Sequence, residues 1–195
     1  MSAWFRPFAC AAGHRSGCPL STLAERVYRS CHLRGSFTLR SGQVSEEYFD
    51  KYLFESQPAL LREVAEAMVS LLPPCDVLAG MEMGGIPIAT VMSQLTGLPA
   101  VFVRKEAKGY GTRKIAEGIA FDGLCVVGVE DVVTTGGALI RGCLALRDSG
   151  ASVDTVVCAI DRDQGGENGL RAQGIELRRA LGREDLAAGS ALSTP

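Results

Sequence analysis

The sequence lacks a marked excess of charge of either sign, and it lacks a long hydrophobic run. Its 195 residues carry 20 Lys and Arg against 22 Asp and Glu, for a formal net charge of −2. A protein that binds duplex nucleic acid usually carries a basic excess, so this balance argues against that class. No apolar run approaches the roughly 18 residues that a transmembrane helix needs. We therefore expect a protein that binds neither nucleic acid nor a membrane.

Cysteine spacings typical of metal or redox sites are also missing. The seven cysteines are an odd number, and no two of them have the two-residue spacing of a zinc ribbon or a redox pair. Several lie in apolar runs, among them Cys125 and Cys158, which is typical of free buried thiols in a reducing compartment. This pattern indicates a cytoplasmic protein.

Acidic residues are absent from the first 24 positions, which gives this segment a faint likeness to a transit peptide. Pro7, Pro19 and the shortness of the apolar stretch argue against a cleaved signal peptide. We expect residues 1–20 to form a poorly ordered N-terminal extension. The remaining length suits a single domain, which we place at residues 21–195.

Apolar runs alternate with helical patterns along most of the chain. The predicted strands are 76–80, 99–103, 123–129 and 153–160. The predicted helices are 22–31, 59–69, 86–95 and 138–148, and a turn, a strand and a second turn are expected over 35–42. Continuous apolar strands separated by helices predict a doubly wound parallel sheet that is covered on both faces. Such α/β sheets bind ligands beyond the carboxyl ends of their strands.

The run from Val126 to Ala138 joins a buried strand to a helix through two acids and a Thr-Thr-Gly-Gly turn. We predict that the strand ends at Glu130 and Asp131. The N–H groups of the turn and of the helix start suit a phosphate, whereas the acids would repel one unless they hold ribose hydroxyls or an accompanying Mg²⁺. Neither G-x-x-x-x-G-K nor a helix-opening G-x-G-x-x-G is present here. A helix cap with two surface acids is the alternative.

This acid-acid, aliphatic-aliphatic, Thr-Thr-Gly-Gly pattern resembles the phosphoribosyl pyrophosphate (PRPP) motif of the type I phosphoribosyltransferases. The resemblance implies their α/β fold, a doubly wound, mainly parallel sheet flanked by helices, with a small hood formed by about residues 21–55 and the C-terminal segment. It also implies that the acids hold the ribose 2′- and 3′-hydroxyls and that the turn holds the 5′-phosphate. The PRPP-binding residues so implied are Glu130, Asp131, Val132, Val133, Thr134, Thr135, Gly136, Gly137 and Ala138.

A basic segment from Arg104 to Lys114 follows a predicted strand and has no apolar periodicity. Five cations in eleven residues, interrupted by two glycines, indicate a mobile loop, and a solvated charge run is the alternative. Arg104 and Lys105 come directly after a buried strand, where unpaired charge is costly unless an anion such as pyrophosphate arrives. A closing basic loop would stabilise a departing pyrophosphate and exclude water.

The Arg-Lys-x-x-Lys-x-x-Gly pattern of this loop resembles the catalytic loop of the orotate phosphoribosyltransferases. The resemblance implies that Arg104, Lys105 and Lys108 contact PRPP, and that Lys108, Lys105 and Asp131 are the catalytic residues, Lys108 foremost. It further implies a homodimer in which part of the loop reaches into the partner's active site. Tyr110 stands where many relatives have histidine, and we place it among the PRPP-binding residues.

A pair of glycines, Gly84 and Gly85, also marks the strand-to-helix turn that follows Met83. Bare backbone there can approach a diphosphate, as the pyrophosphate loop of the family does. Some relatives carry a lysine at the position of Gly84, so we expect Met83 and Gly84 to bind PRPP through main-chain N–H groups. A helix-start turn without a ligand is the alternative.

Recognition of the acceptor base is expected from the hood and from a further strand end. The segment Phe37–Gly42 with the aromatic pair Tyr48-Phe49 resembles the part of the family that lies over the pyrimidine. Arg162 is placed to pair with the orotate carboxylate in a bidentate fork. Core packing of the aromatic pair and a surface pair between Asp161 and Arg162 are the alternatives. The implied orotate-binding residues are Thr134, Arg162, Arg40, Tyr48 and Phe49.

Residues and resemblance together predict a glycosyltransferase of the pentosyltransferase kind in de novo pyrimidine (UMP) biosynthesis. It would transfer the 5-phosphoribosyl group from PRPP to orotate, giving orotidine 5′-monophosphate and pyrophosphate. The reaction is expected to need Mg²⁺, which PRPP itself would mainly hold, with help from Asp131 and without a tight protein site. The alternatives are a phosphoribosyltransferase for another nucleobase and a PRPP-binding regulator without turnover.

Overall fold

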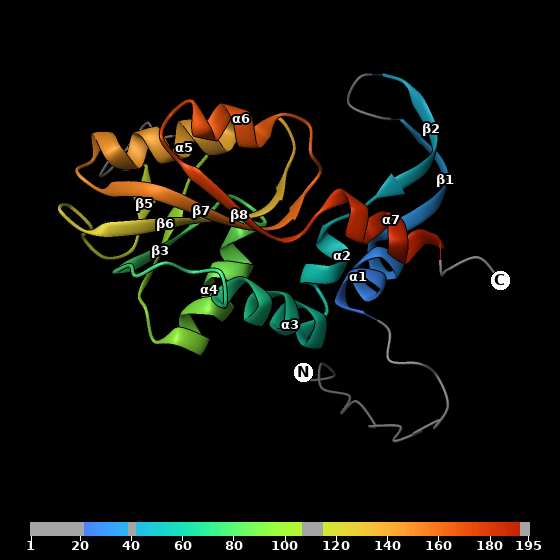
Figure 1. Cartoon of the computed structure of the whole chain (residues 1–195), viewed down its shortest axis with the longest axis horizontal. Helices are drawn as coiled ribbons and strands as arrows, with labels where there is room; N and C mark the ends of the chain where they lie inside the picture. The colour runs from blue at the N-terminus through green and yellow to red at the C-terminus, as the bar shows by residue number, and fades with distance from the viewer. Residues whose placement is uncertain (1–21, 39–41, 107–114, 192–195) are drawn as a thin grey trace, which may run out of the picture.

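The computed structural model describes residues 22–38, 42–106 and 115–191. Across these ranges the central feature is a six-stranded sheet in the order β5-β4-β3-β6-β7-β8, with helices on both faces (Figure 1). Its strands are β3 (Val77–Met81), β4 (Ala100–Val103), β5 (Ala116–Glu117), β6 (Cys125–Val133), β7 (Ser152–Asp161) and β8 (Glu176–Leu181). Neighbouring strands are parallel except β4 and β5. The predicted α/β class with a mainly parallel sheet is confirmed.

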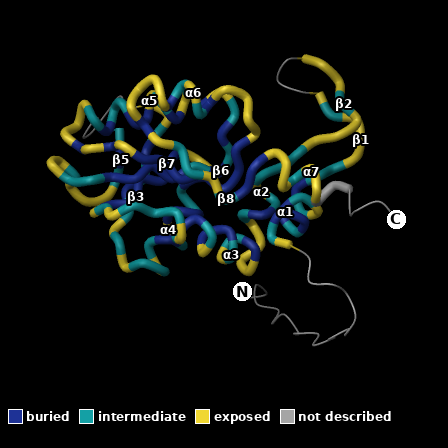
Figure 2. The backbone as a smooth tube through the Cα atoms, in the orientation of Figure 1, coloured by how far each residue is buried: buried dark blue, intermediate teal, exposed yellow. Residues whose placement is uncertain are grey.

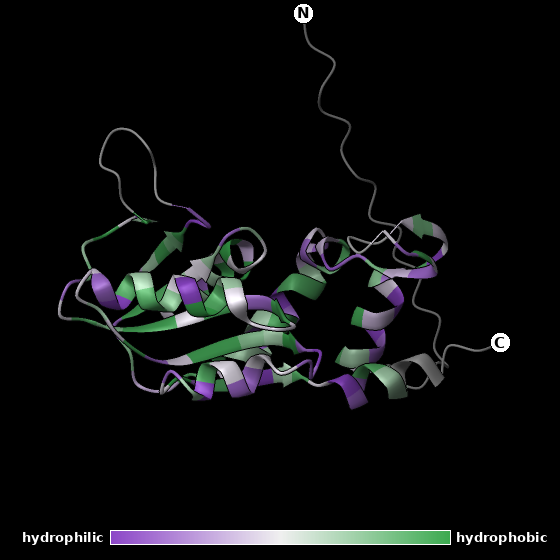
Figure 3. Cartoon of the chain, turned by 90° about the horizontal axis from the view of Figure 1, so that it is seen from above, coloured by the Kyte–Doolittle hydropathy of each residue, from purple (hydrophilic) through white to green (hydrophobic). Residues whose placement is uncertain are grey.

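Two helix layers cover the sheet. Figure 1 shows α5 (Gly137–Asp148) and α6 (Gly166–Arg171) over one face, and α3 (Pro58–Val69) and α4 (Gly85–Thr96) under the other. Each layer closes its own hydrophobic cluster against the sheet. Among the described residues, the central strands β3, β6 and β7 are mostly buried and apolar (Figures 2 and 3), as burial on both faces requires.

A smaller group of elements stands beside the sheet, and we call it the hood. It contains α1 (Leu23–Cys31), the hairpin of β1 (His32–Thr38) and β2 (Val44–Phe49), α2 (Tyr52–Glu55) and α7 (Arg183–Ala191). The C-terminal α7 packs on the N-terminal α1, so both ends of the described chain meet there (Figure 1). Val27 and Phe54 are fully buried in the cluster that α3 also joins. A shared core therefore fixes the hood against the sheet.

Local signals explain where several helices begin and end. The Thr22 hydroxyl accepts a hydrogen bond from the Glu25 N–H at 3.2 Å and caps α1. Pro58 occupies the first turn of α3, where its missing N–H costs nothing. Gly97, at φ 77°, ends α4 in the left-handed conformation that glycine adopts without strain.

Some boundaries differ from the sequence-based expectation. The strand expected to end at the acid pair continues as β6 to Val133, because its pairing with β7 persists to the partners Val133 and Asp161. The turn expected at Gly35 is instead an irregularity within β1, where the register with β2 shifts between Arg34 and Phe37. Strand β5 and helices α6 and α7 carry too few periodic residues to be predicted.

Two remaining expectations concern cysteines and membranes. The five cysteines in the described ranges are free thiols, and Cys31, Cys143 and Cys158 are buried. Of the helices that the structure describes, none is long and apolar enough to cross a membrane. Residues 1–20, for which a poorly ordered extension was expected, lie outside the described ranges.

Candidate active site

The order of the strands positions the candidate site. From β3 the chain moves outward to β4 and β5, and from β6 it moves outward in the other direction to β7 and β8. Strands β3 and β6 are therefore parallel neighbours at the point where the winding reverses. The loops that leave their carboxyl ends part there and open a crevice, the usual ligand site of such sheets.

A cavity of about 460 Å³ lies at this point, and we call it the phosphate cavity. Its wall is made by the end of β6, the turn into α5, the loop after β3, and single residues of the hood and the basic segment. The lining residues are Lys51, Tyr52, Glu82, Met83, Lys105, Glu130, Val132, Val133, Thr134, Thr135, Gly136, Gly137, Ala138, Leu139 and Arg141.

The Thr-Thr-Gly-Gly turn forms the phosphate-binding side of this cavity. Strand β6 ends at Val133, and α5 begins at Gly137 after Gly136 takes a φ of 72°. A Cβ at Gly136 would lie 3.2 Å from Cα of Gly166, so both the backbone angle and the close packing require glycine. The turn and the start of the twelve-residue α5 present backbone N–H groups and the positive end of the helix dipole, which together suit a phosphate.

The two acids of the motif have different surroundings because adjacent residues of a strand point to opposite faces. Glu130 lines the phosphate cavity. Asp131 is fully buried and absent from the lining, and its Oδ2 lies 2.6 Å from Nζ of Lys51. The structure thus places one acid in the cavity and the other in an ion pair with the hood.

The pKa values of these groups follow from their burial and their neighbours. Burial, together with the hydrogen bond and the charge of Asp131, raises the pKa of Glu130 well above its usual range. Burial would also raise the pKa of Asp131, but hydrogen bonding to Glu130 and the charge of Lys51 outweigh it and lower that pKa. Asp131 is therefore the ionised member of the pair.

A third carboxyl, that of Glu55 at the end of α2, belongs to the same group. Burial and the neighbouring Asp131 raise the pKa of Glu55 to about 8. Gly84 fits against both side chains: a Cβ there would lie 1.7 Å from Oδ2 of Asp131 and 2.7 Å from Oε1 of Glu55. Gly84 is outside the cavity lining, so the structure gives it a packing role beneath the cavity, and Glu82 and Met83 are the residues of this loop that line the cavity.

The basic segment is described only up to residue 106. Lys105 lines the phosphate cavity, and its N–H donates to Oε2 of Glu82 at 3.0 Å. Arg104 turns toward β5 and pairs with Glu117, with 3.3 Å between Nε and Oε1, so it does not line the cavity. Lys108 and Tyr110, expected in the PRPP site, lie outside the described residues.

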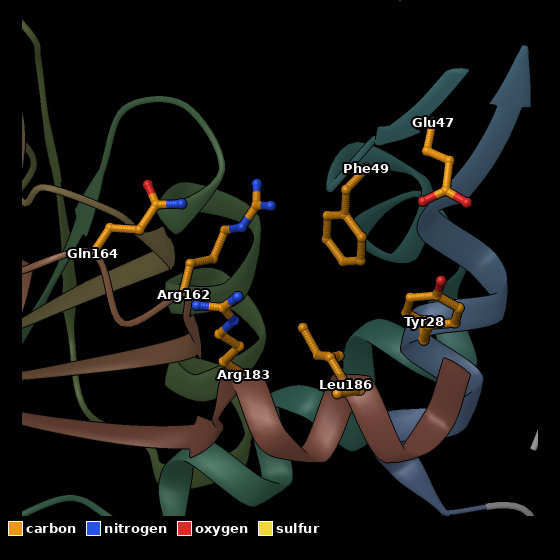
Figure 4. Close-up of a pocket in the computed structure, with 8 residues that line it drawn as sticks. Tyr28, Glu47, Phe49, Arg162, Gln164, Arg183 and Leu186 are labelled. Atoms are coloured by element: carbon orange, nitrogen blue, oxygen red, sulfur yellow. The ribbon is translucent and has the colours of Figure 1, made fainter. Parts of the chain in front are cut away.

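A second cavity of about 460 Å³ lies between the sheet and the hood, and we call it the base cavity (Figure 4). Arg162 and Gln164 approach it from the loop after β7, and Phe49, Tyr28 and Glu47 face them from the hood. Arg183, Leu186 and Ala187 of α7 complete the lining. The backbone N–H of Arg162 donates to the backbone carbonyl of Val133, with 2.9 Å between N and O. This hydrogen bond connects the wall of the base cavity to the end of β6.

The expected aromatic pair is divided between two faces of β2. Phe49 lines the base cavity, whereas Tyr48 is 43% exposed and stacks on Phe37 with 5.4 Å between ring centroids. The reason is the alternation of side chains along a strand, which sends neighbouring residues to opposite sides. Tyr28 of α1, stacked on His32 at 4.7 Å, is the second aromatic ring of the base cavity. Arg40, also expected at the base, lies outside the described residues.

The surface pair considered for Asp161 and Arg162 is not formed. Asp161 is 2% exposed, and its Oδ2 lies 3.7 Å from Nη1 of Arg179 on β8. Its Oδ1 accepts a hydrogen bond from the N–H of Asp163 at 3.0 Å. These contacts hold Asp161 inside the sheet and leave Arg162 lining the base cavity.

Several lining residues escaped the sequence-based reading, among them Lys51, Tyr28 and Arg183. Each belongs to the hood, where the chain carries no glycine-rich or strand-end signal. Lys51 directly follows the Tyr48-Phe49-Asp50 segment, so extension of that segment by one residue was the available signal. Tyr28 and Arg183 had none, because the packing of α7 on α1 brings them together.

Known proteins are similar to this chain in sequence and in fold. A family model for the phosphoribosyl transferase domain matches residues 54–170. An orotate phosphoribosyltransferase of Nocardioides sp. is 55% identical over 169 residues, which are 86% of this chain and 94% of that protein. The Mycobacterium tuberculosis H37Rv orotate phosphoribosyltransferase, solved in complex with PRPP, has a TM-score of 0.73 and 30% identity and covers 85% of this chain and 96% of its own. The Aeropyrum pernix orotate phosphoribosyltransferase has a TM-score of 0.77 and 27% identity, over 89% of this chain and 100% of its own.

The chain therefore belongs to the phosphoribosyltransferase family. Its branch within that family is the orotate phosphoribosyltransferases. The type I fold expected from the acid-acid and Thr-Thr-Gly-Gly pattern is confirmed.

Proposed function

We propose that this chain transfers the 5-phosphoribosyl group from PRPP to N1 of orotate, giving orotidine 5′-monophosphate and pyrophosphate. The observation that carries the proposal is the backbone hydrogen bond at the end of β6 that brings Arg162, which lines one cavity, next to Val133, which lines the other. The phosphate cavity is also lined by the Thr-Thr-Gly-Gly turn, Glu130 and Lys105, and the base cavity by Phe49. A phosphorylated sugar and a flat acidic base can thus meet at one point.

The reaction needs no protein nucleophile. The bond from the anomeric carbon to pyrophosphate breaks, the bond from that carbon to orotate N1 forms, and N1 releases its proton to the solvent. Positive charge develops on the sugar while negative charge grows on pyrophosphate. The N–H groups of the turn at 134–137 hold the 5′-phosphate, and Lys105 with Lys108 stabilises the leaving group. Arg162 orients orotate through its carboxylate, and Phe49 packs on the ring.

Mg²⁺ is proposed to accompany PRPP. The carboxyl groups of Glu82 and Glu130 line the phosphate cavity with oxygen atoms, the ligand type that Mg²⁺ prefers, while Asp131 is engaged by Lys51. A bound cation would favour the ionised form of Glu130. The ion would neutralise charge on the pyrophosphate as it departs. We also propose a cytoplasmic homodimer in which the basic loop completes the partner's site.

The decisive assay follows the absorbance of orotate with PRPP and Mg²⁺, and measures pyrophosphate in parallel. Loss of orotate that depends on PRPP, with one pyrophosphate released per orotate consumed, is the expected result. Turnover of adenine, hypoxanthine or uracil in place of orotate would instead assign another nucleobase. Binding of PRPP without turnover of any base would indicate a regulator.

A mixing experiment tests the shared loop. Lys108→Ala and Asp131→Asn impair different parts of the site, so each variant alone is expected to have little activity. Where the loop acts in the partner's site, a heterodimer of the two variants contains one site with neither substitution. Mixing after dissociation is then expected to restore part of the activity. Recovery no greater than the sum of the separate variants would refute loop sharing.

A further inference from the structure

We propose that Lys51 of the hood is a positioning residue for PRPP, acting through Asp131. The inference rests on the proposed function, because it takes the phosphate cavity to be the PRPP site. Lys51 lies between β2 and α2, far along the chain from the PRPP motif. It nevertheless reaches the second acid of that motif, with 2.6 Å between its Nζ and Oδ2 of Asp131.

The burial of the two side chains shows that the Asp131 carboxylate depends on the charge of Lys51. The Asp131 side chain is 0% exposed, whereas the Lys51 side chain is 32% exposed and also lines the phosphate cavity. A carboxylate with no access to water must be compensated by protein groups. Lys51 is the cation that performs this task, and it does so from the wall of the cavity.

The other groups around Lys51 make its charge more important. The carboxyls of Glu55 and Glu130 both interact with Asp131, and Glu130 faces the cavity. Lys51 also lies 5.3 Å from the ring centroid of Tyr52, another lining residue. One ammonium therefore stands among three carboxyls, of which Asp131 is the ionised one, and its removal would leave the buried charge of Asp131 without this cation.

The packing around Asp131 makes the position of its side chain depend on Lys51. Gly84 lies against the Asp131 and Glu55 carboxyls so closely that even a methyl group would overlap them. The Val132 N–H lies 2.6 Å from Oδ1 of Asp131 itself. Asp131 is thus held on one side by the loop after β3 and on the other by Lys51. Without the lysine, it would turn or take up another partner, and Glu130 beside it on β6 would move as well.

Lys51 consequently links the hood to the sugar end of the phosphate cavity. The base cavity is lined by other hood residues, Tyr28, Glu47 and Phe49. Loss of Lys51 should therefore weaken PRPP binding while leaving orotate recognition largely unchanged. A general loosening of the hood would weaken both, and this difference separates positioning from mere stabilisation.

The test compares Lys51→Met, Lys51→Arg and the matched control Arg62→Met. Arg62 pairs with Glu66 on the exposed surface of α3, with 2.9 Å between Nε and Oε1, away from both cavities. Binding of PRPP with Mg²⁺ is measured by calorimetry in the absence of orotate, followed by the KM for each substrate.

We expect Lys51→Met to raise the Kd and KM for PRPP by roughly tenfold, a typical coupling between contacting residues. The KM for orotate should change less than about twofold. Lys51→Arg should recover part of the loss, and Arg62→Met should match the unsubstituted chain.

A double-variant cycle with Asp131→Asn tests whether Lys51 acts through Asp131. If it does, Lys51→Met combined with Asp131→Asn binds PRPP no more weakly than Asp131→Asn alone. This double variant removes both charges of the ion pair, so it keeps the test available where Lys51→Met alone fails to fold. Additive losses would overturn the proposal, as would an unchanged Kd for PRPP in folded Lys51→Met. If the unsubstituted chain binds PRPP but does not consume orotate, the proposed function fails and the binding comparison still decides the role of Lys51.

Discussion

Replacement of Gly84 by alanine is expected to destabilise the fold and to disturb the acids beneath the phosphate cavity. The backbone at Gly84 has φ −71° and ψ −26°, values that alanine adopts readily. A substitution at such a position normally stabilises a protein by about 0.4–1 kcal/mol through the unfolded chain. Any loss of stability in Gly84→Ala must therefore come from contacts in the folded state.

Those contacts are severe. The new methyl carbon would lie 1.7 Å from Oδ2 and 2.4 Å from Cγ of Asp131, and Asp131 is fully buried. Overpacking of a buried site usually costs about 1–3 kcal/mol. Displacement of Asp131 from Lys51 would add part of the roughly 3–5 kcal/mol that breaking a buried ion pair costs. With about 1–2 kcal/mol of the ion-pair cost included and the alanine gain subtracted, we expect a net loss of about 1–4 kcal/mol in the free energy of unfolding.

Urea denaturation of the ligand-free protein measures this loss. Gly137→Ala is the matched control, since a Cβ there meets nothing closer than Nη1 of Arg141 at 3.7 Å. The control should be as stable as the unsubstituted chain or more stable by up to about 1 kcal/mol. If Gly84→Ala unfolds at the same urea concentration as the control, the close packing of Gly84 on Asp131 is not a constraint and the reasoning is refuted.

The remaining predictions concern the loop, the base cavity and pH. Lys108→Ala should lose most of its turnover, measured by orotate absorbance, while its circular dichroism stays unchanged. Arg162→Met should raise the KM for orotate at least about tenfold and leave the Kd for PRPP nearly unchanged, because a charge-assisted bidentate contact is lost. The raised pKa of Glu55, about 8 in the fold against about 4.5 in the unfolded chain, contributes stability that is complete below pH 4.5 and is lost as the pH rises toward 8. Glu55→Gln should therefore lose less thermal stability than the unsubstituted chain between pH 5 and pH 8.5, as thermal unfolding at a series of pH values will show.

Each of these has a control and a contrary result. Near-normal turnover of Lys108→Ala would remove the loop from the mechanism. Arg171→Met, which takes a cation from an exposed pair with Glu167 on α6, is the control for Arg162→Met, and equal effects on the orotate KM would contradict a specific contact. Glu66→Gln on exposed α3 is the control for Glu55→Gln, and parallel pH profiles of Glu55→Gln and the unsubstituted chain would place the titration elsewhere.

The sequence predicted those parts of the fold whose signals are local. Apolar runs such as 77–81 and 155–160 are buried on both faces of the sheet, the environment that a continuous apolar strand requires. The phosphate turn was equally readable, because two glycines and two threonines between an apolar strand and a helix leave few other conformations. These patterns are short in sequence and need no knowledge of distant partners.

The acid pair marks the limit of this reading. Glu130 and Asp131 are adjacent letters with the same charge, and the motif treats them alike. The continuation of β6 to Val133 divides them between the two faces of the sheet and sends only Glu130 into the phosphate cavity. Lys51 then pairs with Asp131 across a fold that brings the hood against the end of β6.

The sequence alone therefore predicted the class of protein and the phosphate loop. The lack of a charge excess and of a membrane span excluded other classes, and the clustered acids, glycines and cations indicated the phosphate loop. Only the tertiary structure decided which acid lines the phosphate cavity, which aromatic rings line the base cavity with Arg162, and which hood cation compensates the buried Asp131. The physical reason is that propensity and periodicity are properties of neighbouring residues, whereas burial and ion pairing depend on segments that only folding brings into contact.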